Sequence, residues 1–120
     1  MRWEAAVGYS RAVRVGAHIF VSGTTATQTD GTIAGIGDEY TQTRQALINA
    51  LRALAELGAD ARHVVRTRMF VTNIRNWEAV GRAHAEVFGD VRPATSMLQV
   101  SALIDPHMLV EIELDAIVDD

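Results

Sequence analysis

Three acidic side chains alternate with apolar ones near the C-terminus. Glu111, Glu113 and Asp115 are separated by Ile112 and Leu114. Successive side chains of a β-strand point to opposite faces, so this spacing places the three carboxylates on one face. A carboxylate that faces a cleft can orient or deprotonate a water molecule, which makes Glu111 the first candidate for a general base.

Two arginines of another apolar run offer a simpler interpretation of the acids. Arg66 and Arg68 are also two residues apart and would share one face of a strand. Ion pairs across neighbouring strands are common on exposed faces and contribute little to stability. We therefore expect Glu113 and Asp115 to pair with these arginines or to lie in solvent.

His84 and Tyr9 are the other side chains that could serve a site. His84 falls on the apolar stripe of a helix expected over residues 77–89. It is either a core or interface residue with one hydrogen-bonded nitrogen, or a cleft acid or base, since imidazole titrates near pH 6.5. Tyr9 precedes the first expected strand and is either a packing residue or the aromatic lid of a pocket.

Other motifs give weak signals. The four histidines lie far apart and show no metal-ligand spacing, and there is no cysteine, so we expect neither a metal nor a disulfide. Residues 35–40 begin like a dinucleotide loop but lack its third glycine. Ser22 and Gly23 end an expected strand without the flanking glycine of a nucleophile elbow.

Composition limits the class of protein. The chain has 120 residues, 48% hydrophobic and 22% charged, which predicts one globular domain over residues 1–120. Its net charge of −4, with no basic cluster, argues against a nucleic-acid partner. No apolar run reaches the length of a signal peptide core or a membrane span, so we expect a cytoplasmic protein without a membrane partner.

The elements that must position these residues follow from turn signals and apolar periodicity. We expect two short strands within residues 11–23, a helix from Asp38 to Leu57 that Gly58 ends, a strand over 63–73, a helix over 77–89 capped by Asn76 with Trp77 on its apolar stripe, and strands over 96–103 and 108–118. This order predicts an α+β fold with one sheet and two helices on one face. The last two strands should form an antiparallel hairpin, and an oligomer should cover the free face.

The C-terminal segments resemble those of the RidA/YjgF family, also labelled L-PSP endoribonucleases. Residues 92–103 and 109–117 are similar to its signature, P-A-(R/T)-(S/T) followed by a strand and then (V/I)-E-I-E, and the resemblance extends over nearly the whole chain. It implies a chorismate-mutase-like α+β fold, assembled as a homotrimer with clefts between subunits. Many members hydrolyse reactive imines or enamines to ketoacids and ammonia, without metal or cofactor.

The resemblance also implies roles for single residues. Tyr9 is similar to the pocket tyrosine of the family, and Ser22 and Gly23 match its Ser-Gly at the cleft. Met97 stands where the family's backbone contacts ligand. Glu111 matches the carboxylate that positions the attacking water.

One position departs from the imine-hydrolysing members. Their motif is P-A-R-S, and its arginine grips the substrate carboxylate with a bidentate guanidinium, whereas this chain has Thr95. A helix position that is often asparagine is Gly81, and a nearby aromatic position is His84, with Arg82 in the same turn. The pattern indicates a divergent branch, and one hypothesis is that His84 or Arg82 replaces the missing charge.

Three functions are compatible with these residues. The first is a deaminase-like hydrolase of a small imine, enamine or carbonyl compound, in which Glu111 activates water and His84 donates a proton. Its substrate would be held by Tyr9, Ser22, Gly23, Arg82, Thr95 and Met97. The second is a trimeric small-molecule-binding or chaperone-like protein without catalysis. The third, an endoribonuclease, conflicts with the net charge of −4.

Overall fold

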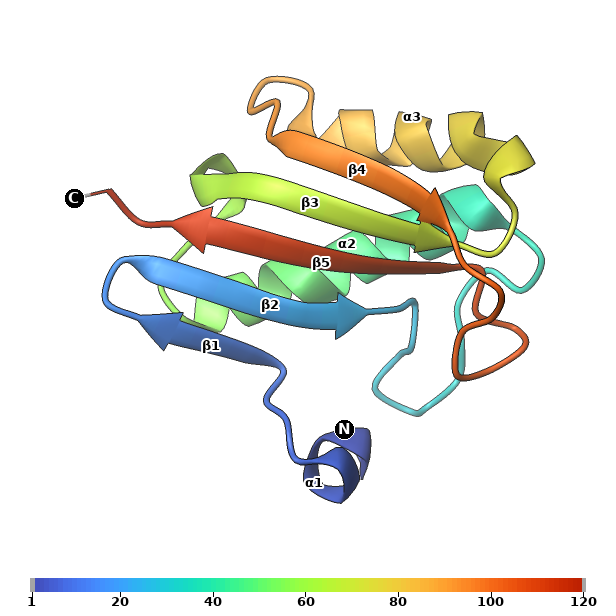
Figure 1. Ribbon diagram of the computed structural model, residues 1–120, viewed down its shortest axis with the longest axis horizontal. Coiled ribbons are helices and arrows are strands. Elements are labelled where there is room, and N and C mark those ends of the chain that lie inside the picture. Colours follow the sequence, from blue (N-terminus) through green and yellow to red (C-terminus); the bar gives the residue numbers. More distant parts are fainter. Residues whose placement is uncertain (1, 120) are drawn as a thin grey trace.

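One five-stranded sheet carries two long helices on a single face (Figure 1). The computed structural model describes residues 2–119. Its helices and strands are α1 (Arg2–Val7), β1 (Ala12–Val15), β2 (His18–Thr24), α2 (Glu39–Glu56), β3 (Val64–Val71), α3 (Trp77–Phe88), β4 (Ala94–Gln99) and β5 (Val110–Ile117), with 3-10 turns at Ala61–His63 and Ile74–Asn76. The predicted α+β class and the two covering helices are confirmed, whereas α1 was not predicted.

The predicted C-terminal hairpin is wrong. The strand order is β1-β2-β5-β3-β4, so β4 and β5 do not pair. The chain passes from β3 through α3 to β4, and this crossover places β4 parallel to β3 at the edge of the sheet. β5 then runs antiparallel to both β2 and β3 in the centre. Its alternate buried apolar residues suit a central strand, while the side chains of β4 are mostly exposed.

The core lies between the sheet and α2. Leu47, Ala50 and Leu54 of α2 are buried against the apolar side chains of β5, among them Ile112 and Leu114. Asp38 caps this helix, since its carboxylate accepts a hydrogen bond from the backbone N–H of Thr41. The face of β5 that carries Ile112 and Leu114 is thus covered by the helices. The acidic residues of β5 lie on its other face, which no helix of residues 2–119 covers.

The start of α3 differs from the prediction. Asn76 occupies the N-cap position, but its side chain makes no capping bond and instead donates to the carboxylate of Glu39 in α2. Trp77 is 55% exposed, so it does not belong to the apolar stripe. Val80 and Phe88 do form that stripe and are buried. The first turn of α3 is therefore anchored by a polar contact to α2 rather than by the indole.

Gly81 lies in the interior of α3, where glycine is unfavourable. A Cβ at this position would meet only the Trp77 ring, at 3.9 Å, which is ordinary contact. Glycine destabilises a helix interior by roughly 0.5–1 kcal/mol relative to alanine. We expect Gly81→Ala to raise the free energy of unfolding by about this amount in urea denaturation. A lower stability would instead show that a group outside this chain needs the space.

Two kinds of feature are missing between residues 2 and 119. No helix there has the length and apolar character needed to cross a membrane. No group of three His, Cys, Asp or Glu side chains in this range is arranged to hold a metal ion.

Candidate functional site

Glu111 lies on the open face of the sheet, packed against the backbone of Gly23. It is half-buried and sits in β5 opposite Phe70 of β3. A Cβ at Gly23 would overlap Oε2 of Glu111 and lie 2.8 Å from its Cδ. The carboxylate can therefore occupy this position only because residue 23 has no side chain.

The surroundings of Glu111 change its acidity. Burial raises the pKa of the carboxyl, the nearby Arg11 guanidinium lowers it, and Glu113 raises it. Burial is the largest of these effects and the net direction is upward. A carboxylate with a raised pKa is a better proton acceptor near neutral pH than an ordinary surface glutamate.

Arg11 connects the predicted residues of this face, and sequence reasoning did not single it out. Its guanidinium donates a hydrogen bond to the carbonyl of Gly23 and lies 5.9 Å from the centre of the Tyr9 ring. Its backbone carbonyl accepts from the N–H of Ser22, whose hydroxyl donates to the carbonyl of Ser10 over 2.6 Å. The structure thus brings Tyr9, Ser22, Gly23 and Glu111 together around Arg11.

The other two acids of β5 are surface ion pairs, as predicted. Nη1 of Arg68 lies 3.7 Å from Oε1 of Glu113 and 3.3 Å from Oδ2 of Asp115. All three side chains are partly exposed, so these pairs contribute about 0–1 kcal/mol each to stability. Glu111 is therefore set apart from its neighbours by burial and by its contact with Gly23.

Thr95 and His84 lie on the opposite face of the sheet. Thr95 is paired in register with Thr67, which is fully buried beneath the helices. The two hydroxyl oxygens are 2.8 Å apart, and Nε2 of His84 in α3 lies 2.9 Å from Oγ1 of Thr67. Met97 follows on the same face and packs against the core. Because β3 separates β4 from β5, Thr95 and Glu111 do not lie on adjacent strands of one chain.

The hydroxyl chain defines the tautomer of His84. A threonine hydroxyl has one proton to donate. Thr95 donates to the carbonyl of Pro93 over 3.0 Å, so Thr67 donates to Thr95 and accepts from His84. His84 thus carries a proton on Nε2, and this hydrogen bond corresponds to the first of the two alternatives, a residue with one hydrogen-bonded nitrogen.

Neither proposed substitute for the missing arginine places a cation at Thr95 within one chain. Burial lowers the pKa of His84, so its imidazole is neutral at neutral pH. Arg82 stacks on the ring of Tyr40 in α2, with its Cζ 4.5 Å from the ring centre. Since residues two apart on a helix differ by about 200° in direction, Arg82 points away from the face that carries His84.

Acid is expected to destabilise the protein through His84. The unfolded chain, with an ordinary imidazole pKa near 6.5, binds this proton more readily than the folded chain does. Stability should therefore fall as pH drops from about 6.5 towards the lowered pKa. Melting temperatures of the protein and of His84→Gln would be measured across this pH range. The melting temperature of the variant should change less with pH than that of the unaltered protein. Parallel curves would contradict this assignment.

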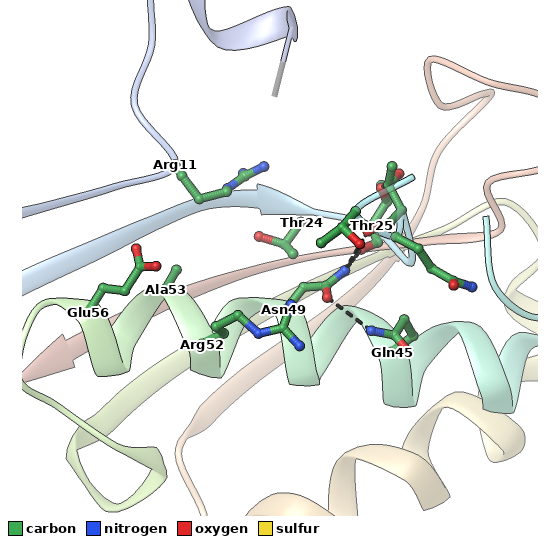
Figure 2. A pocket seen from close by; sticks show the side chains of 11 residues that line it. Arg11, Thr24, Thr25, Gln45, Asn49, Arg52, Ala53 and Glu56 are labelled. Atoms are coloured by element: carbon green, nitrogen blue, oxygen red, sulfur yellow. Dashed lines mark hydrogen bonds between the residues drawn. The ribbon is translucent and has the colours of Figure 1, made fainter. Parts of the chain in front are cut away.

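A polar cavity of about 520 Å³ lies beside Arg11, between the end of β2 and α2 (Figure 2). It is lined by Arg11, Thr24, Thr25, Thr27, Gln28, Thr29, Gln45, Asn49, Arg52, Ala53 and Glu56. The amide of Asn49 fixes one wall, since it donates to the carbonyls of Thr25 and Thr27 over 3.0 and 2.9 Å. No sequence motif indicated this cavity, because its lining residues are scattered over three segments and most of them share only polarity.

Known proteins with similar sequence and fold agree with the architecture. An uncharacterized protein of Streptomyces coelicolor is 44% identical over 114 residues, which are 95% of this chain and 84% of that protein. The crystal structure of a Mycobacterium tuberculosis member of the YjgF/YER057c/UK114 family superimposes with a TM-score of 0.90 at 50% identity, covering 98% of this chain and 93% of that one. The protein named 3-aminoacrylate deaminase RutC of Acinetobacter baylyi is 29% identical over 94 residues, 78% of this chain and 74% of its own.

The profile of one family covers almost every described residue. Endoribonuclease L-PSP matches residues 1–118, including the segments that carry the C-terminal signature. The sheet with two covering helices is the chorismate-mutase-like fold that the resemblance implied. The chain therefore belongs to the endoribonuclease L-PSP family, also called the YjgF or Rid family.

Proposed function

We propose that this chain, as a single domain over residues 1–120, is a cytoplasmic, deaminase-like hydrolase of a small imine, enamine or carbonyl compound. The observation that carries the proposal is the half-buried carboxylate of Glu111, held against Gly23 with a raised pKa. Its acidity suits a base that takes a proton from water near neutral pH. The relative named as a 3-aminoacrylate deaminase supports the same class of reaction.

The chemistry requires only water and one proton-transfer group. Glu111 accepts a proton from a water molecule as the water oxygen bonds to the carbon of the C=N group. Glu111 returns this proton to the nitrogen, which gives a carbinolamine. The hydroxyl proton of the carbinolamine then passes to the nitrogen as the C=O bond forms and the C–N bond breaks. The products are a carbonyl compound and ammonia, and no electron is gained or lost. Tyr9, Ser22 and the backbone of Gly23 would hold the substrate beside the carboxylate.

The arrangement supports a homotrimer with clefts between subunits. Glu111 and Thr95 lie on opposite faces of one chain, so a site that uses both needs two chains. The open face also exposes apolar side chains that water solvates poorly, namely Val13, Val15, Phe20, Leu98 and Ile117. Neighbouring subunits would bury these residues and bring Thr95 and Met97 of one chain towards Glu111 of the next.

Light scattering should give three times the 13.1 kDa chain mass.

Turnover assays test the reaction. The purified protein would be supplied with 3-aminoacrylate and, separately, with 2-iminopropanoate generated by an amino-acid dehydratase, and ammonia release would be followed. We expect ammonia release above the uncatalysed rate from at least one of the two. Both carry a carboxylate and Thr95 provides no guanidinium for it, so we expect both to require a high substrate concentration. If the protein accelerates none of these reactions, the hydrolase proposal fails.

A binding protein without catalysis is the second candidate. It is favoured by the chain of hydrogen bonds from His84 through Thr67 to Thr95, which engages these groups with one another rather than with a ligand. Saturable binding of a small metabolite with no turnover would support it. Endoribonuclease activity is disfavoured by the net charge of −4 and would require cleavage of RNA that Glu111→Gln abolishes.

A further inference from the structure

The polar cavity beside Arg11 has the size of a metabolite site but an unusual lining. At about 520 Å³ it falls within the range of small-molecule pockets, which are mostly apolar. Here arginine, threonine and amide side chains predominate, and Figure 2 shows Arg11 on the β2 side of the cavity and Asn49 and Arg52 on the α2 side. The charged and amide side chains of this lining provide groups that can bind a small polar ligand.

The polar groups of the wall fall into two classes. The amide of Gln45 donates to Oδ1 of Asn49 over 3.0 Å, and Asn49 donates to the loop carbonyls. The hydroxyls of Thr25 and Thr27 bond to each other over 2.7 Å. These contacts shape the cavity and engage many of the uncharged hydrogen-bond donors in its wall. The groups that remain to attract a ligand are the cations Arg11 and Arg52.

Arg11 has an unmet hydrogen-bonding need. Its Nε is buried and has no hydrogen-bond partner among residues 2–119, although another nitrogen of the same group donates to Gly23. A buried N–H of a charged group without an acceptor is unfavourable, because the group has lost its bonds to water and gained none in the protein. Arg11 also lines the cavity, and the planar fork of a guanidinium suits carboxylate and phosphate geometry.

We propose that this cavity is a binding site for a small anion, a carboxylate or a phosphate, held between Arg11 and Arg52. Glu56 also lines the cavity, one helical turn beyond Arg52, and its charge restricts the ligand to one compact anionic group rather than a polyanion. The site is separate from the hydrolytic one, because Tyr9, Ser22 and Glu111 do not line it. Only Arg11 contacts both, so the site does not depend on the proposed reaction.

The test is a binding measurement on the full chain with pyruvate, inorganic phosphate and the neutral methyl pyruvate. Titration would be followed by calorimetry and by the arginine Nε–H signals in NMR spectra. We expect pyruvate or phosphate to bind at millimolar or lower concentration and to shift the Arg11 signal, while methyl pyruvate does neither. The stronger of the two anions identifies the chemistry of the natural ligand.

Variants locate the site. Loss of a charge-assisted hydrogen bond should weaken binding about tenfold or more in Arg11→Gln and in Arg52→Gln. Arg11→Lys keeps the charge but not the forked guanidinium, so its affinity for the anion should be intermediate. If Arg11→Gln does not fold, Arg52→Gln still tests the site. Arg75→Gln removes an exposed arginine outside the cavity and should bind as the unaltered protein does. The proposal is overturned if neither anion binds, if methyl pyruvate binds equally, or if affinity survives in both arginine variants.

Discussion

Replacing Glu111 with glutamine is expected to reduce turnover of the imine or enamine substrate by about 10²–10⁴-fold, the contribution of a positioned general base. Glutamine preserves the shape of the side chain but cannot accept a proton from water. The oligomeric mass should remain that of the unaltered protein. Initial rates of ammonia release at saturating substrate, with light scattering on the same samples, measure both effects.

The same substitution should make the protein more stable. Burial raises the pKa of Glu111 above that of the unfolded chain, so stability falls as pH rises through the window between the two values. At neutral pH the folded protein therefore holds an unfavourable buried charge, which Glu111→Gln removes. Its melting temperature should exceed that of the unaltered protein at neutral pH, and the gap should narrow in acid.

Glu113→Gln is the matched control, because Glu113 lies on the same face of β5 and pairs with Arg68 at the surface. It should leave turnover nearly unchanged and alter stability by no more than about 1 kcal/mol. If both glutamine variants lost activity equally, the loss would reflect the total charge of the face rather than a base at Glu111. If neither lost activity, the hydrolytic role of Glu111 would be refuted.

Gly23→Ala is expected to displace the Glu111 carboxylate without unfolding the protein. The new methyl group would overlap Oε2 of Glu111, and the end of that flexible side chain can move away. A misplacement of about 1 Å in a catalytic group can lower the rate on the order of 10²-fold. We expect a loss of this size in the ammonia-release assay. The melting temperature should show that the variant is still folded under the conditions of the assay.

Gly81→Ala provides the comparison, since it adds the same methyl group at a position with open space. It should retain activity and gain stability. A Gly23→Ala variant with full activity would show that the packing of Glu111 against Gly23 is irrelevant to turnover. If Gly23→Ala fails to fold, it would be combined with Glu111→Ala, which removes the side-chain atoms that the new methyl group would overlap. Recovery of folding in the double variant would attribute the failure to the contact with Glu111.

Local sequence patterns predicted the elements well and their pairing poorly. The alternation of Ile112 and Leu114 with acids defined β5 and its buried face, and Asp38 and Gly58 defined the ends of α2, because these signals act within a few residues. Which strands become neighbours depends on contacts between distant segments. The hairpin prediction assumed that strands adjacent in sequence pair, whereas α3 and the loop after β4 are arranged so that β5 fills the centre.

In the candidate site, too, the sequence predicted single residues but not the contacts between distant segments. The C-terminal signature identified Glu111 and the Ser-Gly match identified Gly23, and the structure places the two residues in contact. Arg11 carried no signal, because its importance depends on how the start of β1 lies beside β2. The hydrogen-bond chain from Thr95 to His84 likewise depends on the register of β3 with β4, which no local pattern encodes.

The central position of β5 has a consequence for how the molecule forms. β5 follows every strand that it joins, and until it is in place β1–β2 and β3–α3–β4 are separate units with no shared hydrogen bonds in the sheet. A chain that leaves the ribosome N-terminus first can build each unit early but can join them only after residues 110–117 have emerged. Each unit then exposes an unpaired inner edge while synthesis continues, which is a period of vulnerability to aggregation. Loss of this single strand would divide the sheet into two separate parts rather than narrow it by one strand.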